Sequence, residues 1–323
     1  MDNKYHDKLI VSSAPHAVGP ISTQKIMGLV LVALIPAFIS GIYQFGYRAA
    51  VLTIVCVIAC VVFEYLMNVI LKKKQTVGDL SAVLTGVLLA FNLPSGLPYW
   101  IAIVGCFAAI VVVKQLFGGI GQNLVNPAVT ARIFLFIAFA TEMTTWPTAR
   151  GAGVDAVTSA TPLGELGMGG PEAVTASNMD LFLGNVGGCI GEVSALALLL
   201  GLGYMLWKKI ISWHIPVSIL GTVLVFAGLM HLVNPVAYAS PLAHLFTGGL
   251  MLGAIFMATD YVTSPMTHKG MIIYGVAIGF LTVVIRNFGA YPEGMSFAIF
   301  IMNAFTPLIN TYCKPKRFGE VKK

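Results

Sequence analysis

Apolar stretches of about twenty residues, the length at which a helix crosses a bilayer, recur along almost the whole chain. Of its 323 residues, 57% are hydrophobic and only 10% are charged, and the mean hydropathy is +0.86. A soluble domain of this length has no interior large enough for so much apolar surface. The sequence therefore predicts an all-α polytopic membrane protein.

The apolar pattern predicts about ten transmembrane helices and divides the chain into five parts. The spans are expected at 25–43, 48–71, 78–92, 98–117, 127–146, 185–207, 214–233, 243–259, 271–290 and 294–312. The parts are an N-terminal tail (1–24), a first five-helix membrane half (25–146), a loop (147–184), a second five-helix half (185–312) and a C-terminal tail (313–323). Because each half has an odd number of spans, the second half starts from the opposite side of the membrane. This predicts two inverted five-helix repeats.

The basic residues predict the orientation of these spans. Most of the 19 lysines and arginines, including those at 72–74 and 208–209, fall on one side of the membrane, whereas Arg48 and Arg150 fall on the other. The positive-inside rule then places both termini in the cytoplasm and the 147–184 loop outside it. The N-terminal tail is charged and lacks the compact apolar stretch of a cleavable signal peptide. Since topology explains the net charge of +6, we expect a lipid bilayer and no nucleic acid as the partner.

A short run rich in hydroxyl side chains lies in the predicted loop. It reads Asp155-Ala156-Val157-Thr158-Ser159-Ala160-Thr161-Pro162-Leu163. The small Ala160 leaves a threonine oxygen open to an incoming group, and Pro162 is expected to keep the chain from continuing directly into a helix. An ordinary surface loop explains the same composition, because Ser and Thr beside Gly and Pro are typical of loops. From the residues alone, both interpretations stay open.

Three segments together resemble one known family. Thr158-Ser159-Ala160-Thr161 is similar to the flavin-attachment motif S/T-S-A-T, the segment 117–128 (FGGIGQNLVNPA) is similar to F-G-G-x-G-x-N-x-x-N-P-A, and 257–265 (MATDYVTSP) to M-A-T-D-x-V-T-S-P. The likeness extends from about residue 21 to about residue 310. It is to the membrane subunits shared by Rnf electron-transport complexes (type D) and Na⁺-translocating NADH:quinone reductases (type B), and the type D likeness is the greater one.

The resemblance implies a fold like that of urea transporters and a redox role. By that likeness Thr161 holds FMN covalently through a phosphoester, and Asp155, Thr158, Ser159, Ala160, Pro162 and Leu163 belong to the attachment motif. A separate flavin transferase attaches the FMN outside the cytoplasm. The implied complex moves electrons between ferredoxin and NAD⁺ and couples this to Na⁺ or H⁺ transport. It lies in a bacterial or archaeal cell membrane, with other membrane and peripheral subunits of types A, B, C, E and G.

Two asparagines, Asn123 and Asn126, precede the predicted span at 127–146. Their amides offer both a donor and an acceptor, as the edge of a flavin ring requires. The resemblance to the quinone reductase makes them candidates for contacts to a second, non-covalent flavin such as riboflavin. Capping of the following helix is the alternative role.

Four glycines, Gly184, Gly187, Gly188 and Gly191, surround the predicted start of the span at 185–207. Spaced glycines either bring backbone amides close to a phosphate at a helix N-terminus or allow close helix packing. Both roles stay open.

Several ionisable residues fall within predicted spans, where they are functional candidates. Glu192 is expected roughly two turns inside the 185–207 span, where it could pair with Arg286 as a structural ion pair. The alternative is that one of the two tunes a flavin potential or gates an ion. Lys114 and Arg132 lie near predicted span ends and are expected to extend toward water.

Other chemistries have less support. The five cysteines lack C-x-x-C spacing and are expected to be buried, inert thiols, and the glycines at 118–121 follow a span instead of the strand that a dinucleotide loop requires. A channel or transporter without a prosthetic group is the alternative function, and the predicted inverted repeat favours it. A type B quinone reductase subunit is the third, although its relatives usually have a longer N-terminal extension.

Overall fold

The computed structural model describes residues 22–147, 161–169, 176–289 and 293–314. Within these ranges the chain forms helices and no strand, and an isolated β-bridge joins Pro94 to Cys189. Four helices are long and apolar enough to cross a membrane: α1 (Thr23–Phe45), α2 (Tyr47–Ile70), α10 (His214–Val233) and α13 (His268–Phe288). The all-α, multi-pass membrane fold is therefore confirmed. The count of ten spans, the inverted repeats and the likeness to urea transporters stay predictions.

Shorter helices make up the rest of the described chain. They are η2 (Val77–Asp79), α3 (Ser81–Phe91), α4 (Tyr99–Phe107) with the π-helical η3 (Ala108–Gln115), α5 (Pro127–Ala138), α6 (Ala140–Met143), α7 (Pro162–Gly169), α8 (Asn178–Leu183), α9 (Ala195–Trp207), α11 (Pro241–Phe246), α12 (Leu250–Leu252), the π-helical η5 (Gly253–Met257) and α14 (Met295–Tyr312). At ~1.5 Å per residue, α3, α5 and α9 are too short to cross a hydrocarbon layer of about 30 Å.

Two predicted spans are interrupted in the structure. The span expected at 185–207 becomes helical only at Ala195, because the preceding residues run along the end of α3, where the Ile190 amide donates to the Leu93 carbonyl (3.2 Å) and the Gly191 amide to the Phe91 carbonyl (3.0 Å). The span expected at 243–259 is divided into α11, α12 and η5. The second of these breaks lies where Thr247, Gly248 and Gly249 interrupt the apolar run.

Small residues bring the helices of the two halves close together. A Cβ atom on Gly201 of α9 would lie 2.5 Å from the Ala33 carbonyl oxygen of α1. Within the second half, a Cβ on Gly279 of α13 would lie 2.8 Å from the Ile219 carbonyl oxygen of α10. Such close approach is the usual way in which membrane helices gain packing energy. Large apolar side chains such as Ile54 and Ile58 of α2 are exposed, as expected of a surface that faces lipid.

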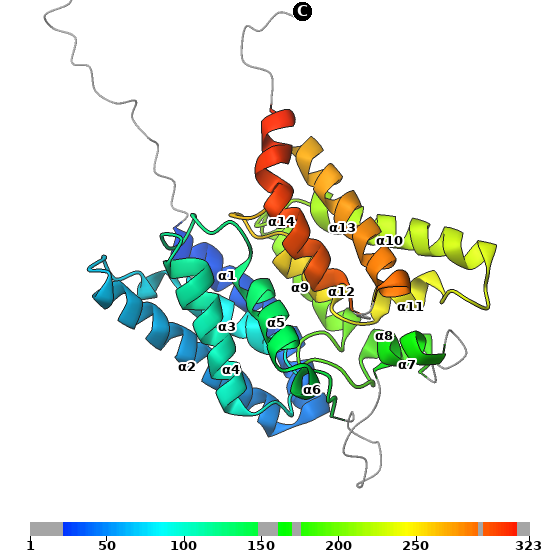
Figure 1. Ribbon diagram of the computed structural model, residues 1–323, viewed down its shortest axis with the longest axis horizontal. Helices are drawn as coiled ribbons and strands as arrows, with labels where there is room; N and C mark the ends of the chain where they lie inside the picture. The colour runs from blue at the N-terminus through cyan, green and yellow to red at the C-terminus, as the bar shows by residue number, and fades with distance from the viewer. Residues whose placement is uncertain (1–21, 148–160, 170–175, 290–292, 315–323) are drawn as a thin grey trace, which may run out of the picture.

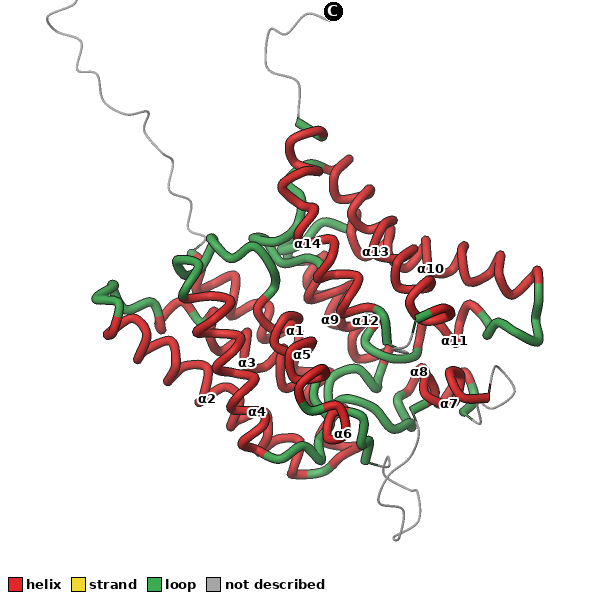
Figure 2. Tube along the Cα trace, viewed as in Figure 1, coloured by secondary structure: helices red, strands yellow, loops and turns green. Residues whose placement is uncertain are grey.

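The helices run between two opposite edges of the molecule. α1 begins and α14 ends at the upper edge in Figure 1, whereas α6, α7 and α8 lie along the lower edge. Figure 2 shows the loops gathered at the same two edges, with helices between them. The segment that carries Thr161 is therefore at the edge opposite the start of α1 and the end of α14.

Candidate functional site

Thr161 is the N-cap of the short helix α7. Its Oγ1 accepts a hydrogen bond from the Gly164 amide (3.0 Å), and its carbonyl accepts one from the Glu165 amide (2.9 Å). Pro162 is the first residue of α7, where a proline fits because its missing N–H would have no helical partner. The expectation that Pro162 prevents a direct entry into a helix is thus wrong. The motif residues Asp155, Thr158, Ser159 and Ala160 lie outside the described residues.

A pocket of about 370 Å³, here called the outer pocket, opens beside Thr161. Its lining combines α7, α8, the segment before α9 and the start of α14: Thr161, Pro162, Leu163, Leu181, Val186, Gly187, Gly188, Glu192, Val193, Phe246, Thr247, Gly248 and Glu293. The structure brings four residues singled out in the sequence together in this lining: Thr161, Gly187, Gly188 and Glu192. Glu293 was not foreseen as part of this site.

The four glycines divide between the two roles considered for them. Gly187 and Gly188 line the outer pocket, whereas a Cβ on Gly191 would collide with the Phe91 ring of α3. Gly184 ends α8 in a left-handed conformation with a φ of 97°. None of them starts α9, whose N-cap is Ser194.

Glu192 is buried between the outer pocket and α5. Its Oε1 accepts a hydrogen bond from the Cys189 amide (3.1 Å), while Oε2 lies 3.9 Å from an Arg132 guanidinium nitrogen and has no hydrogen-bond donor among the described residues. The expected pair with Arg286 is replaced by this contact.

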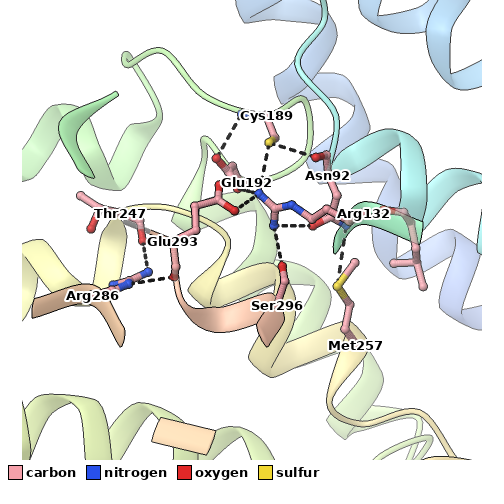
Figure 3. Close-up of polar contacts among 10 residues, drawn as sticks. Asn92, Arg132, Cys189, Glu192, Thr247, Met257, Arg286, Glu293 and Ser296 are labelled. Carbon is pink, nitrogen blue, oxygen red and sulfur yellow. Dashed lines mark hydrogen bonds and ion pairs between the residues drawn. The ribbon is translucent and has the colours of Figure 1, made fainter. Parts of the chain in front are cut away.

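Arg286 stabilises the backbone around the outer pocket through hydrogen bonds. Its guanidinium donates to the carbonyls of His244 (2.5 Å), Thr247 (2.8 Å) and Glu293 (3.2 Å). The carbonyls of His244 and Thr247 lie at the end of α11 and have no helical partner, so these bonds fix the wall formed by Thr247 and Gly248. Figure 3 shows Arg286 with Thr247 and Glu293.

Arg132 is the centre of the buried polar cluster drawn in Figure 3. It donates to Asn92 Oδ1 (3.0 Å) and Ser296 Oγ (3.0 Å) and forms an ion pair with Glu293. Its side chain is only 4% exposed, so the expectation that it extends toward water is wrong. The sequence did indicate that this residue is a functional candidate, because an arginine inside the apolar run of α5 needs buried partners. The partners themselves come from distant segments and were not predictable.

The same cluster contains the one close group of possible metal ligands among the described residues. Cys189, Glu192 and Glu293 place ligand atoms within 4.8 Å of one another. Arg132 lies against all three, since its guanidinium is also 3.7 Å from Cys189 Sγ. A positive guanidinium in that place competes with a cation for the same ligands.

A larger pocket of about 820 Å³, here called the inner pocket, lies at the opposite edge of the molecule. It is lined by the first turn of α1 and the turn after α9, and by Lys114, Asn123, Asn126, Asp260 and Tyr261. Both asparagines are largely buried. The pocket therefore combines donors and acceptors from both halves of the chain with apolar walls, as small-molecule sites usually do.

Asn126 has a capping role and lines the inner pocket as well. Its Oδ1 accepts from the amides of Ala128 (3.0 Å) and Val129 (3.3 Å) at the start of α5, and its Nδ2 donates to the Met257 carbonyl (3.2 Å). Asn123 Nδ2 donates to the Val125 carbonyl (3.0 Å). The capping of α5 is thus present, and it does not exclude a ligand contact.

Lys114 is buried at the inner pocket with its own partners. Its ammonium donates to Glu64 Oε2 (2.7 Å) and Ser81 Oγ (2.6 Å). The expectation that it extends toward water is wrong. Because Glu64 is fully buried, each charge compensates the other inside the first half.

The five cysteines form no disulfide, and all except the half-buried Cys313 are buried. Cys56 and Cys60 lie one turn apart on α2, and Cys106 Sγ lies 3.5 Å from the Cys56 carbonyl oxygen. Buried thiols in apolar surroundings are typical of helix packing.

The fold and these buried charges define a polytopic membrane protein with two pockets at opposite edges. The chain belongs to the NQR2, RnfD, RnfE family, whose model matches residues 10–319. The D subunit of the Na⁺-translocating ferredoxin:NAD⁺ oxidoreductase complex of Acetobacterium woodii is 48% identical over 97% of this chain and 96% of its own length. The D subunit of the proton-translocating complex of Clostridium ljungdahlii is 42% identical over 96% of each chain, and that of the ion-translocating oxidoreductase complex of Stutzerimonas stutzeri is 39% identical over 93% of each. The resemblance to the type D subunits of Rnf complexes is confirmed.

Proposed function

We propose that this chain is the flavin-carrying D subunit of an ion-translocating ferredoxin:NAD⁺ oxidoreductase, with FMN joined to Thr161. FMN bound there would accept electrons from one redox partner and pass them to another. The chain itself would fix the position and the electrostatic surroundings of the flavin. The observation that carries the proposal is the position of Thr161, a motif threonine at a helix N-terminus beside a pocket.

The residues around Thr161 fit a phosphoester. A phosphate on Oγ1 would lie at the N-terminus of α7, where the amides of the first turn and the helix dipole favour negative charge. Gly187 and Gly188, which carry no side chain, also line the pocket. The pocket of about 370 Å³ includes space that is open to solvent. It suits a ligand that is partly enclosed and partly open to a neighbouring subunit.

We also propose that the inner pocket holds a second, non-covalent flavin such as riboflavin. This pocket combines apolar walls with polar groups and is open to solvent, and Asn123 offers an amide at its wall. Two flavins at opposite edges would give electrons a route across the membrane within one chain.

The ion and the partners follow from the kind of complex. The two relatives with the greatest identity quoted above are named for Na⁺ in one case and for protons in the other, so the proposal specifies ion translocation without the ion. The expected partners are subunits of types A, B, C, E and G and a flavin transferase. The extracytoplasmic position of Thr161 and the cytoplasmic termini belong to the same proposal, since the transferase acts outside the cytoplasm.

Covalent flavin on the purified chain tests the proposal against its rivals. The chain is expressed with a flavin transferase and separated by denaturing electrophoresis, and flavin fluorescence is measured in its band. We expect fluorescence in the native chain but none in Thr161→Ala. The matched control is Thr144→Ala, which changes an exposed threonine outside the motif and is expected to keep the fluorescence.

Flavin released by acid reports the second site and is expected to fall in Asn123→Ala. A non-fluorescent native chain would favour the transporter. Co-purification of quinone reductase subunits would favour a type B subunit.

A further inference from the structure

Basic and aromatic side chains gather where α9 ends and where α10 and α13 begin. We call this surface the basic belt, and it consists of Trp207, Lys208, Lys209, Trp213, His268 and Lys269. Every one of these residues is exposed, and Trp207 and Trp213 have 73% and 55% of their surface accessible. Large exposed tryptophans beside lysines are unusual on a surface that contacts only water.

Contacts between the three helices show that the belt is one continuous surface. The His214 ring stacks on Trp213, with 4.2 Å between ring centres, and on His268, with 4.3 Å. Ser212 Oγ lies 3.2 Å from Met271 Sδ, which holds the turn after α9 against the first turn of α13. The lysines that flank this stack are therefore on the same side of the molecule.

The belt carries positive charge without nearby compensation in the sequence. The segments 207–214 and 266–271 contain three lysines and no Asp or Glu. The described salt bridges involve Lys114 and Arg132 and none of the belt lysines. Lys208 Nζ instead lies 4.3 Å from the centre of the Trp207 ring. Such a surface attracts an anion and offers aromatic faces beside it.

The position of the belt indicates which kind of anion binds there. α10 and α13 are candidate membrane spans, and the belt lies at their first residues, where hydrocarbon gives way to headgroups. Tryptophan rings prefer this level, and lysines there attract anionic lipids. The position of Trp213, His268 and Lys269 at the starts of two candidate membrane spans favours a lipid headgroup over a soluble acidic protein. We propose that the basic belt binds the headgroup of an anionic phospholipid.

Lipid binding at the belt would act on the inner pocket. Ile210 and Ile211, in the turn that follows Lys209, line that pocket. Tyr261 also donates a hydrogen bond from its hydroxyl to the Ile210 carbonyl. A headgroup that holds Lys208 and Lys209 on the outer side of the turn therefore stiffens one wall of the pocket.

Native mass spectrometry of the purified complex tests this inference with phosphatidylglycerol and phosphatidylcholine as probes. The belt variant replaces Lys208, Lys209 and Lys269 by Ala. The matched control replaces the three lysines at 72–74, which lie in a basic turn without tryptophan. We expect the native chain and the control to retain phosphatidylglycerol in preference to phosphatidylcholine. The belt variant is expected to retain at least about tenfold less phosphatidylglycerol than the native chain.

Three outcomes would overturn the inference. If the belt variant retained as much phosphatidylglycerol as the native chain, the basic belt would not be a lipid site. If the control lost as much phosphatidylglycerol as the belt variant, the retention would reflect general charge attraction. Loss of another subunit from the belt variant, with phosphatidylglycerol retention unchanged, would assign the surface to a protein partner. None of these outcomes depends on covalent flavin, so a failure of the proposed function is distinguishable from a failure of lipid binding.

Discussion

Arg132 connects several segments beside the outer pocket through its side-chain contacts. It is buried on α5 in the first half and contacts Asn92 at the end of α3, Cys189 and Glu192 before α9, and Glu293 beside α14. One guanidinium thus joins segments that are far apart in the sequence. Removing it leaves the buried Glu192 and the half-buried Glu293 without their cation, and an uncompensated buried charge is much costlier than a lost pair.

Arg132→Met is therefore expected to destabilise the protein by about 3–5 kcal/mol. The midpoint of thermal unfolding in detergent measures the loss. Arg48→Met is the matched control, because Arg48 is exposed and donates to the Gly96 carbonyl (3.0 Å). Equal midpoints for Arg132→Met and the control would contradict a structural role for the cluster.

Glu192 gives a second prediction at this scale, which depends on FMN at Thr161. Glu192→Gln keeps the acceptor for the Cys189 amide and removes one negative charge from the pocket wall. Because a nearby negative charge disfavours the electron-rich form of a flavin, the midpoint potential is expected to rise, on the order of tens of millivolts. Redox titration measures it, with Glu142→Gln on α6 as the control outside the pocket lining. A fully assembled variant with an unchanged potential would leave Glu192 a purely structural role.

In the segment from Cys189 to Gly191, packing determines the backbone conformation more than helix propensity does. It is apolar enough to be helical, yet it packs between α1 and α3 without forming a helix. A Cβ on Gly41 of α1 would lie 2.5 Å from the Ile190 carbonyl oxygen, and one on Gly191 would collide with Phe91. This path is what turns Glu192 toward the outer pocket.

Gly191→Ala tests this packing. The added methyl group has no room beside the Phe91 ring, so overpacking is expected to cost about 1–3 kcal/mol and to lower the thermal midpoint. Gly203→Ala in α9 is the matched control, because a Cβ there meets nothing within 4 Å. If the midpoint of Gly191→Ala equals or exceeds that of Gly203→Ala, the close approach is not a constraint in the folded protein.

The sequence predicted the long elements well and the broken ones poorly. The expected spans at 48–71 and 214–233 match α2 and α10 within one residue at each end, because hydropathy and length specify a helix that crosses the membrane. The late start of α9 depends on contacts with Phe91 and Leu93, about a hundred residues earlier in the chain. Likewise, Thr161 was found from its local motif, whereas the partners of Arg132 come from α3 and α14.

At the scale of the whole molecule, the two candidate sites lie at opposite edges of the helix bundle. The outer pocket adjoins α7 and α8, and the inner pocket adjoins the start of α1. This arrangement agrees with the expected topology, in which the Thr161 loop and the chain termini are separated by the membrane. It would suit a subunit that passes electrons across the membrane.

Labelling of engineered cysteines tests that topology. In a Cys313→Ala background, Met179→Cys is expected to react with a membrane-impermeant maleimide in intact cells, because Met179 is 65% exposed on α8, the helix whose Leu181 lines the outer pocket. Lys73→Cys, after α2, is expected to react only after lysis. If only Lys73→Cys were labelled in intact cells, the orientation of the chain in the membrane would be the opposite of the expected one.

Peptide mass spectrometry of the 150–180 loop, on protein from membranes that contain the flavin transferase, is the decisive test of FMN at Thr161. We expect a mass gain equal to FMN less one water, localised to Thr161 and absent from Thr161→Ala. An unmodified Thr161 in cells that flavinylate other proteins would contradict this expectation, and the chain would then share the family fold without the covalent flavin.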